Sequence, residues 1–294
     1  METDVPASPP RRALVLGGGG STGNAWLIGV VAGLADAGLD PTGADLVVGT
    51  SAGATAAAQL TAVPPAELYA ATQAAPPAPP PGSTGRRVSA ASDQMRRTAD
   101  VIAAASDPAD LRRRLGASAL ELPTSTDEET RERWRSIVAS RLPRDVWPEQ
   151  HLVLTAVDAA TGEPVTFDRS SGVGLAEAVA ASCSSGFAFR IGERRYLDGG
   201  YRTNADNADL AAGCERVLVL SPYGGRARTP AAWGLHLADQ VAALEAAGSQ
   251  VRVLSPAEDL TGARAMDLSL RPAAARSGYD LGRAEAASLA SLWR

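Results

Sequence analysis

The chain has 294 residues, of which 45% are hydrophobic and only 4% aromatic, so it can bury a sizeable core built mainly of Ala, Val and Leu. Its net charge of −5 argues against a nucleic-acid-binding protein, which needs a basic face. The few cysteines and histidines exclude a disulfide framework and argue against a Cys- or His-based metal site; they are Cys183, Cys214, His151 and His236.

The N-terminal residues 1–11 are polar and contain prolines, and we expect them to form a disordered leader. They lack the basic and then apolar pattern of a signal peptide. No run of about 18 apolar residues occurs, so the sequence predicts no membrane span. We therefore expect a cytoplasmic protein.

Two strand–helix units follow the leader. The apolar residues 12–16 predict a strand buried on both faces, and residues 24–37 carry apolar side chains at helical spacing. Residues 46–48 predict a second buried strand, and an alanine-rich helix over 52–62 follows it.

Residues 64–150 differ in composition and predict a helical insertion that caps the sheet. Packed cover is a more ordinary role for such a block than a moving lid. A proline-rich loop is expected at 75–82. Ser125, with Glu128 three positions later, resembles a capping box at the start of a helix. The expected helices are 67–72, 92–105, 108–115 and 125–142.

Alternating strands and helices resume after residue 150, which predicts an α/β fold. We expect one domain over residues 12–294, a three-layer α/β/α sandwich with a mostly parallel central sheet. The expected strands are 151–157, its hairpin partner within 163–168, 194–197, 216–220 and 250–254, and the expected helices are 175–182, 230–247 and 280–293.

A G-x-S-x-G motif joins the second predicted strand to its helix. The sharp turn that this context favours would project Ser51 from its corner, near the free N–H groups of a helix N-terminus. Gly49 and Gly53 have no Cβ, which allows the strand and the helix to approach closely. The motif therefore makes Ser51 a candidate nucleophile, although a small-residue turn that contains a serine by chance has the same pattern.

A glycine-rich stretch from Gly18 to Gly23 lies between the first strand and its helix. Its G-x-G-x-x-G pattern is typical of dinucleotide-binding folds, but that function needs an acidic residue at the end of the second strand, and Asp40 precedes that strand. The alternative is an oxyanion hole, in which the N–H groups of Gly18, Gly19 and Gly20 would each contribute about 2.7–4 kcal/mol.

A serine nucleophile needs a base, and neither histidine fits that role. His151 opens a strand at the end away from Ser51, and His236 lies within a helical pattern. Asp198 ends a short strand and is followed by Gly199 and Gly200, so it could approach another loop. A carboxylate in a dry site can have a raised pKa and act as the base, although D-G-G is also a common turn.

Three motifs occur in order, G-G-G-S-T-G, G-T-S-A-G and D-G-G, and together they resemble the patatin-like phospholipase family. Residues 152–168, 180–183 and 207–210 are also similar to that family. The resemblance spans about residues 12–290 and implies a patatin-like fold with a Ser-Asp dyad that uses no histidine. It implies no cofactor and no metal.

The resemblance implies that Ser51 is the nucleophile, Asp198 the base, and the loop at Gly18, Gly19 and Gly20 the oxyanion hole. It implies a serine acyl hydrolase of phospholipase A or esterase type, acting on a lipid or other acyl ester through an acyl-enzyme. Any membrane contact would be peripheral and brief, through apolar residues at the mouth of the pocket.

Residues 184–190 depart from the family pattern, which usually has prolines in this stretch. The serines here make this wall of the pocket more polar, which affects the acyl-chain preference. Two alternatives to the hydrolase stay open. One is a non-catalytic family member that binds a ligand or a partner, and the other is a dinucleotide-dependent oxidoreductase.

Overall fold

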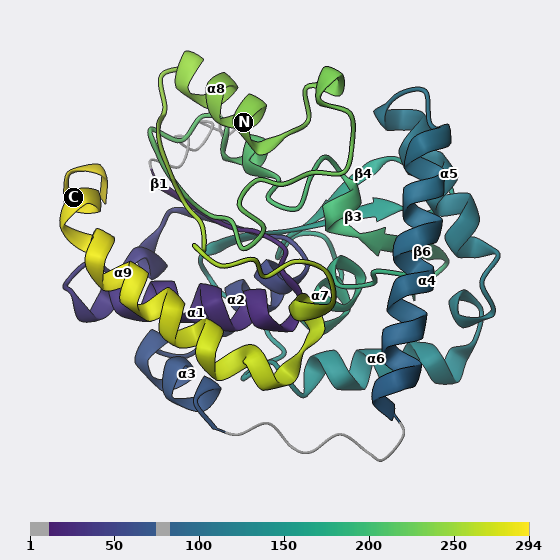
Figure 1. The fold of residues 1–294 in the computed structure, drawn as a ribbon, viewed down its shortest axis with the longest axis horizontal. Helices are drawn as coiled ribbons and strands as arrows, with labels where there is room; N and C mark the ends of the chain where they lie inside the picture. The colour runs from purple at the N-terminus through teal and green to yellow at the C-terminus, as the bar shows by residue number, and fades with distance from the viewer. Residues whose placement is uncertain (1–11, 75–82, 294) are drawn as a thin grey trace, which may run out of the picture.

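The computed structural model describes residues 12–74 and 83–293 (Figure 1). The leader 1–11 and the proline-rich loop 75–82 lie outside the described residues. The strands are β1 (Arg12–Leu16), β2 (Leu46–Gly49), β3 (His151–Asp158), β4 (Pro164–Phe167), β5 (Phe189–Ile191), β6 (Arg194–Asp198), β7 (Arg216–Leu220) and β8 (Gln250–Leu254).

Helices alternate with these strands. The α-helices are α1 (Gly20–Asp36), α2 (Ala52–Leu60), α3 (Pro65–Thr72), α4 (Ser83–Ala104), α5 (Pro108–Leu120), α6 (Glu128–Ala139), α7 (Leu175–Ser182), α8 (Leu237–Ala246) and α9 (Arg271–Trp293). The short 3₁₀ helices are η1 (Pro41–Gly43), η2 (Pro123–Ser125), η3 (Gly199–Tyr201), η4 (Ala208–Ala211), η5 (Ala231–Trp233), η6 (Gly262–Met266) and η7 (Leu268–Leu270).

The described strands form one sheet in the order β5-β6-β3-β2-β1-β7-β8, with β4 paired to β3. The pairs between β3, β2, β1, β7 and β8 are all parallel, whereas β4, β5 and β6 run antiparallel to their neighbours. The predicted α/β class and the mostly parallel sheet are therefore confirmed. The parallel order brings the loops after β1 and β2 to the same edge of the sheet.

Alternate side chains of β1 enter two hydrophobic cores, one on each face of the sheet. Leu14 and Leu16 pack into the core that contains α1, α2 and α9. Ala13 and Val15 pack into the opposite core, against η4 and α8. Figure 1 shows α8 on one side of the strands and α1 and α9 on the other. The period-2 alternation of a strand thus gives the three layers.

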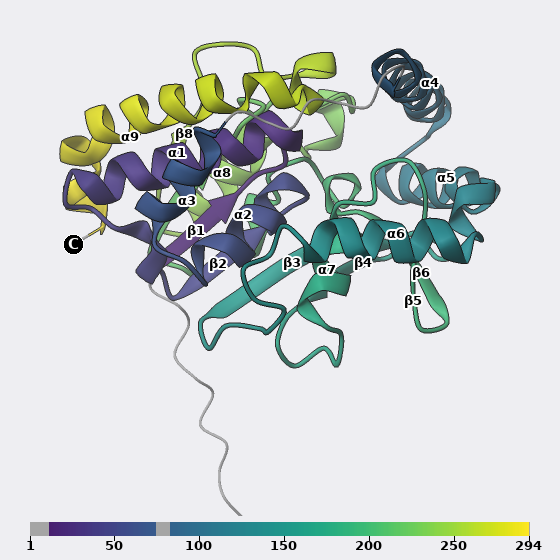
Figure 2. The same ribbon diagram turned by 90° about the horizontal axis from the view of Figure 1, so that it is seen from below.

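The predicted helical block 64–150 contains helices with different neighbours. α3 packs against α1 and α9, α6 against α7, α4 against α5, and α5 against β6. Figure 2 shows α4 and α5 at the same end of the molecule as β5 and β6. Leu111 and Leu115 of α5 form a third core with Val157 and Leu197. The division into one domain with a capping insertion stays a prediction. None of the described helices has the length and hydropathy needed to cross a bilayer.

The predicted start of α6 is wrong. Asp127, not Ser125, caps the helix, because its side chain accepts a hydrogen bond from the N–H of Thr130. The Ser125 hydroxyl is buried instead, where it donates to the Ala119 carbonyl and accepts from the Ala188 N–H. A tertiary contact therefore replaces the local cap that the spacing predicted.

Several other boundaries differ from the prediction. α4 begins at Ser83 and α5 ends at Leu120, so both are longer than the predicted helices 92–105 and 108–115. α1 begins at Gly20 and α9 at Arg271, both earlier than their periodicity indicated. The helix predicted over 230–247 divides into η5 and α8, because Gly234 adopts a left-handed conformation (φ +64°) that ends the first turn. His236 is the N-cap residue of α8 rather than a residue inside a helix.

Candidate active site

The turn between β2 and α2 holds Ser51 in a conformation that few side chains adopt. Its φ of +52° and ψ of −115° lie outside the common regions, which indicates strain of the kind stored at functional sites. The surrounding chain holds it there: the Ser51 N–H donates to Ser182 Oγ at 2.9 Å, and the Cys183 thiol donates to the Ser51 carbonyl at 3.0 Å.

Two glycines permit this turn. A Cβ on Gly53 would collide with the Leu16 carbonyl at the end of β1, and a Cβ on Gly49 would lie 2.7 Å from the Cα of Ala54. Because both neighbours are backbone atoms, they cannot swing aside as a flexible side chain would. The strand, the turn and the helix can pack this closely only where these side chains are absent.

The Ser51 hydroxyl donates a 2.9 Å hydrogen bond to Asp198 Oδ2, which joins residues 147 positions apart in the chain. The other oxygen of Asp198 accepts the N–H of Gly200 at 2.8 Å. Asp198 is only 5% exposed, and this burial raises its pKa to about 6, opposed by the hydrogen bonds from Gly200 and Ser51. A buried carboxyl with this pKa can accept a proton from a hydroxyl that donates to it.

The glycine loop lies directly beside Ser51. A Cβ on Gly18 would lie 3.5 Å from the Cβ of Ser51. The Gly18 N–H donates to the Ala205 carbonyl at 2.8 Å, so it is engaged within the protein. Gly19 precedes the first residue of α1, Gly20, and neither N–H has a hydrogen-bond partner among the described residues. Of the three predicted donors, Gly19 and Gly20 therefore have N–H groups free to hold an anion.

Two apolar side chains lie against the glycine loop, and an aromatic side chain lies near Asp198. Pro222 packs so closely on the loop that a Cβ on Gly19 would lie 2.6 Å from the Cβ of Pro222. Burial, together with the nearby Asp198, raises the pKa of Tyr223 to about 12, so this hydroxyl is neutral at ordinary pH. Met266 lies against Gly20 and is 65% exposed. It thus supplies an apolar side chain near the loop.

Neither histidine belongs to this site. His151 is exposed at the start of β3, beside Leu46 and at the end of the sheet away from Ser51. His236 contacts the Thr229 carbonyl through Nε2 and caps α8. Asp40, the acid considered for a dinucleotide ribose, caps η1 before β2 begins. The described residues also contain no group of three or more His, Cys, Asp or Glu able to hold a metal ion.

Residues 184–190, which depart from the family pattern, include two that contact other elements of the fold. The Ser184 hydroxyl is fully buried and contacts the carbonyls of Ala181 (2.7 Å) and Tyr196 (3.0 Å), so this serine does not line an open pocket. Gly186 (φ +116°) packs against Gln94 of α4. The cavity beside them measures about 30 Å³, which suits a water molecule rather than an acyl chain.

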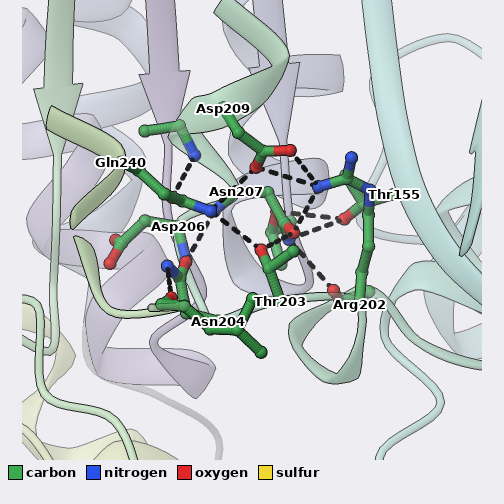
Figure 3. A network of polar contacts seen from close by, with 12 residues as sticks. Thr155, Arg202, Thr203, Asn204, Asp206, Asn207, Asp209 and Gln240 are labelled. Carbon is green, nitrogen blue, oxygen red and sulfur yellow. Dashed lines mark hydrogen bonds and ion pairs between the residues drawn. The ribbon is translucent and has the colours of Figure 1, made fainter. Parts of the chain in front are cut away.

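A buried polar network, shown in Figure 3, was not predicted from the sequence. Its centre is Asn207, which is fully buried and has a left-handed backbone (φ +53°). It contacts Thr50, beside the candidate nucleophile, and Gly199, beside the candidate base. The only signal in the sequence was that residues 207–210 are similar to the family.

A second buried acid, Asp206, lies under the glycine loop. Its Oδ1 packs against Gly17 and has no hydrogen-bond partner, so any Cβ on Gly17 would collide with it. Burial raises its pKa to about 7, and a hydrogen bond with Ser221 opposes this shift. The site therefore contains two buried carboxyl groups, of which only Asp198 touches Ser51.

Comparisons with known proteins identify the family. VipD from Legionella pneumophila has 14% sequence identity and a TM-score of 0.44, over 95% of this chain and 67% of VipD. The type III effector protein ExoU has 16% identity and a TM-score of 0.37, over 95% of this chain and 53% of ExoU. No curated protein matches the chain. The family model for patatin-like phospholipases matches residues 14–211, about two thirds of the chain, and includes both Ser51 and Asp198. The resemblance noted in the sequence is thereby confirmed, and the chain belongs to the patatin-like phospholipase family.

Proposed function

We propose that this protein is a serine acyl hydrolase that cleaves lipid or other acyl esters through a Ser51–Asp198 dyad and an acyl-enzyme. Membership of the patatin-like phospholipase family supports a lipid acyl hydrolase in general. The observation that carries the finer proposal is the 2.9 Å hydrogen bond from Ser51 Oγ to a buried carboxyl whose pKa is raised to about 6.

The first half of the reaction forms the acyl-enzyme. Asp198 takes the proton of the Ser51 hydroxyl as Oγ attacks the ester carbonyl carbon. The N–H groups of Gly19 and Gly20 hold the oxyanion of the tetrahedral intermediate, in which each donor is worth about 2.7–4 kcal/mol. When the intermediate collapses, the C–O bond to the alcohol breaks, and protonated Asp198 returns its proton to the leaving oxygen.

The second half releases the acid. Asp198 removes a proton from a water molecule, which attacks the acyl carbonyl, and the same N–H groups hold the second oxyanion. The ester bond to Ser51 then breaks, and the proton held by Asp198 passes to Oγ. This cycle needs one group that alternates between base and acid, and a carboxyl with a pKa near neutrality is suited to both roles.

The test is labelling with a fluorophosphonate probe, together with hydrolysis of p-nitrophenyl esters of increasing chain length. We expect the wild type to label at one serine, Ser51→Ala to lose labelling, and Asp198→Asn to label far more slowly. Ser140→Ala removes an exposed serine hydroxyl that donates to the Ile137 carbonyl, and as the control it should label as the wild type does. A folded wild type that neither labels nor hydrolyses any ester would contradict the proposal and favour a non-catalytic ligand-binding protein.

A further inference from the structure

We infer that Asn207 is a positioning residue, which holds the turn carrying Ser51 in place against the turn carrying Asp198. This inference rests on the proposed function, because it concerns the geometry of the proposed dyad. Ser51 lies in the turn after β2 and Asp198 is the last residue of β6, so a single hydrogen bond between them cannot by itself set their relative position. A second connection between the two turns would do so.

The Asn207 amide makes that connection through the residues next to the dyad. Its Nδ2 donates to Thr50 Oγ1 at 3.0 Å and to the Gly199 carbonyl at 3.0 Å. Thr50 directly precedes Ser51, and Gly199 directly follows Asp198. The two amide hydrogens therefore match the two acceptors, one on each catalytic turn.

The orientation of this amide is determined by donors on its other side. Asn207 Oδ1 accepts from the Thr203 hydroxyl at 2.7 Å and from Arg202 Nη1 at 3.1 Å. Because arginine can only donate, the oxygen must face Arg202 and the NH₂ group must face Thr50 and Gly199. Arg202 is itself fixed by an ion pair with Asp209, as Figure 3 shows.

Asn207 also has no freedom to move. It is fully buried, and its backbone N–H donates to Asn204 Oδ1 at 2.8 Å. Its left-handed conformation is one that asparagine adopts more readily than most residues. The Thr155 hydroxyl of β3 also donates to Thr50 Oγ1 at 3.0 Å, and it lies 3.5 Å from Asn207 Nδ2. The clamp formed by Thr50, Asn207 and Gly199 is thus buried and held against β3 through Thr155.

The test compares variants by turnover per reactive serine, counted by fluorophosphonate labelling, so that misfolded protein does not count. Asn207→Asp keeps the size of the side chain and removes both amide donors. We expect kcat per labelled site to fall by about 10- to 100-fold, since a displacement of about 1 Å can cost 10²-fold. KM should change little, because Asn207 is buried away from the substrate.

A matched pair tests the same contact from the nucleophile side. Thr50→Val removes the hydroxyl that accepts from Asn207 and should lower kcat per site in the same way, whereas Thr50→Ser keeps that hydroxyl and should recover most of the loss. Ser249→Ala removes a buried hydrogen bond to the Cys214 carbonyl, far along the chain from both turns. It should lower thermal stability and leave kcat per site unchanged.

A double variant separates positioning from general stability. If Asn207 acts through the dyad, the single variant Asn207→Asp should be labelled by the fluorophosphonate more slowly than the wild type. The double variant Asn207→Asp/Asp198→Asn should be labelled at about the same rate as Asp198→Asn alone. A wild type that does not label at Ser51 would overturn the proposed function and this inference together. A reactive wild type with Asn207→Asp and Thr50→Val both within about 2-fold of its kcat per site would overturn only the positioning role.

Discussion

Ser51 Oγ and Asp198 Oδ2 lie 2.9 Å apart because β2 and β6, the two neighbours of β3, end close to each other. β3 separates β2 from β6, and it pairs with the end of β6, where Ala156 lies opposite Asp198. β3 continues beyond the end of β2, and β6 pairs only with this continuation, so β6 ends level with the turn that carries Ser51.

The rate of ester hydrolysis should depend on pH through Asp198. Its pKa of about 6 means that the carboxyl is protonated, and unable to act as a base, below that pH. We expect kcat/KM to rise with pH through about 6, with the slope of a single proton. The measurement is the initial rate with a neutral ester between pH 4.5 and 7, with circular dichroism at each pH to confirm that the protein stays folded.

Asp206→Asn is the control for this profile, since Asp206 is the other buried carboxyl with a raised pKa near the loop. The kcat/KM of this variant should rise with pH around a midpoint close to that of the wild type. An acid limb that disappears in Asp206→Asn, or a wild-type rate that is constant between pH 4.5 and 7, would argue against Asp198 as the base.

Much of this site could be predicted from the sequence because its parts are local. Ser51 follows an apolar run and Asp198 ends a short predicted strand, and both lie beside glycines. The carboxyl ends of parallel strands also meet at one edge of an α/β sheet, which places the glycine loop beside Ser51. The same pattern predicted most strands and helices. β5 was missed because it has only three residues, Phe189–Ile191, which is too short to show a period.

The remaining features depend on contacts between distant residues. The Gly18 N–H is engaged by the Ala205 carbonyl, a pairing that no spacing indicates. The clamp at Asn207 joins Thr50 and Gly199 through side-chain geometry that exists only in the folded protein. α1 begins early, at Gly20, which has a left-handed conformation (φ +62°) that glycine adopts without strain.

The free energy of unfolding should fall as pH rises, and Asp206→Asn should remove the part of this fall that comes from Asp206. The pKa of Asp206 is raised from 3.8 to about 7, so between these values the folded protein keeps a proton that the unfolded chain releases. The stability that the folded state gains by keeping this proton on Asp206 is fully present below pH 3.8 and is lost as pH rises through about 7. Relative to the wild type, Asp206→Asn should gain up to about 3 kcal/mol between pH 5 and 8. Urea unfolding at both pH values measures this difference.

Asp259→Asn is the control for that experiment. Asp259 is an exposed carboxyl whose pKa is lowered by hydrogen bonds from Thr261, so it titrates below this pH range. Its difference from the wild type should be constant between pH 5 and 8. If Asp206→Asn also differed from the wild type by a constant amount, Asp206 would not be the group that retains the proton.

Gly33 in α1 should not tolerate even a methyl group, because α1 and α9 are in direct backbone contact there. A Cβ on Gly33 would collide with the Tyr279 carbonyl of α9. Alanine is favoured over glycine in a helix by about 1 kcal/mol, but overpacking costs about 1–3 kcal/mol, and both surfaces here are rigid helices. We expect Gly33→Ala to lower the free energy of unfolding by up to about 2 kcal/mol in denaturant titration.

Gly43→Ala provides the comparison for Gly33. Nothing lies within 4 Å of a Cβ at Gly43, which is exposed at the end of η1. Its effect should stay within about 0.5 kcal/mol, as for most surface substitutions. A Gly33→Ala variant at least as stable as the wild type would show that α1 and α9 can separate without cost.

Ser125 should contribute to stability as a buried bridge rather than as a helix cap. Its hydroxyl donates to the Ala119 carbonyl of α5 at 2.6 Å and accepts from the Ala188 N–H, beside β5, at 2.8 Å. Ser125→Ala would leave that N–H buried without a partner, at a cost of about 1–3 kcal/mol. Thermal and urea unfolding should both show the loss.

Ser140→Ala distinguishes this bridge from an ordinary serine near a helix end. The Ser140 hydroxyl also donates to a carbonyl, that of Ile137 at 2.8 Å, but it is exposed, so water can replace the lost contact. We expect Ser140→Ala to stay within about 0.5 kcal/mol of the wild type. Equal effects of the two variants would mean that the Ala188 N–H finds another partner, and that η2 does not join α5 to β5 through Ser125.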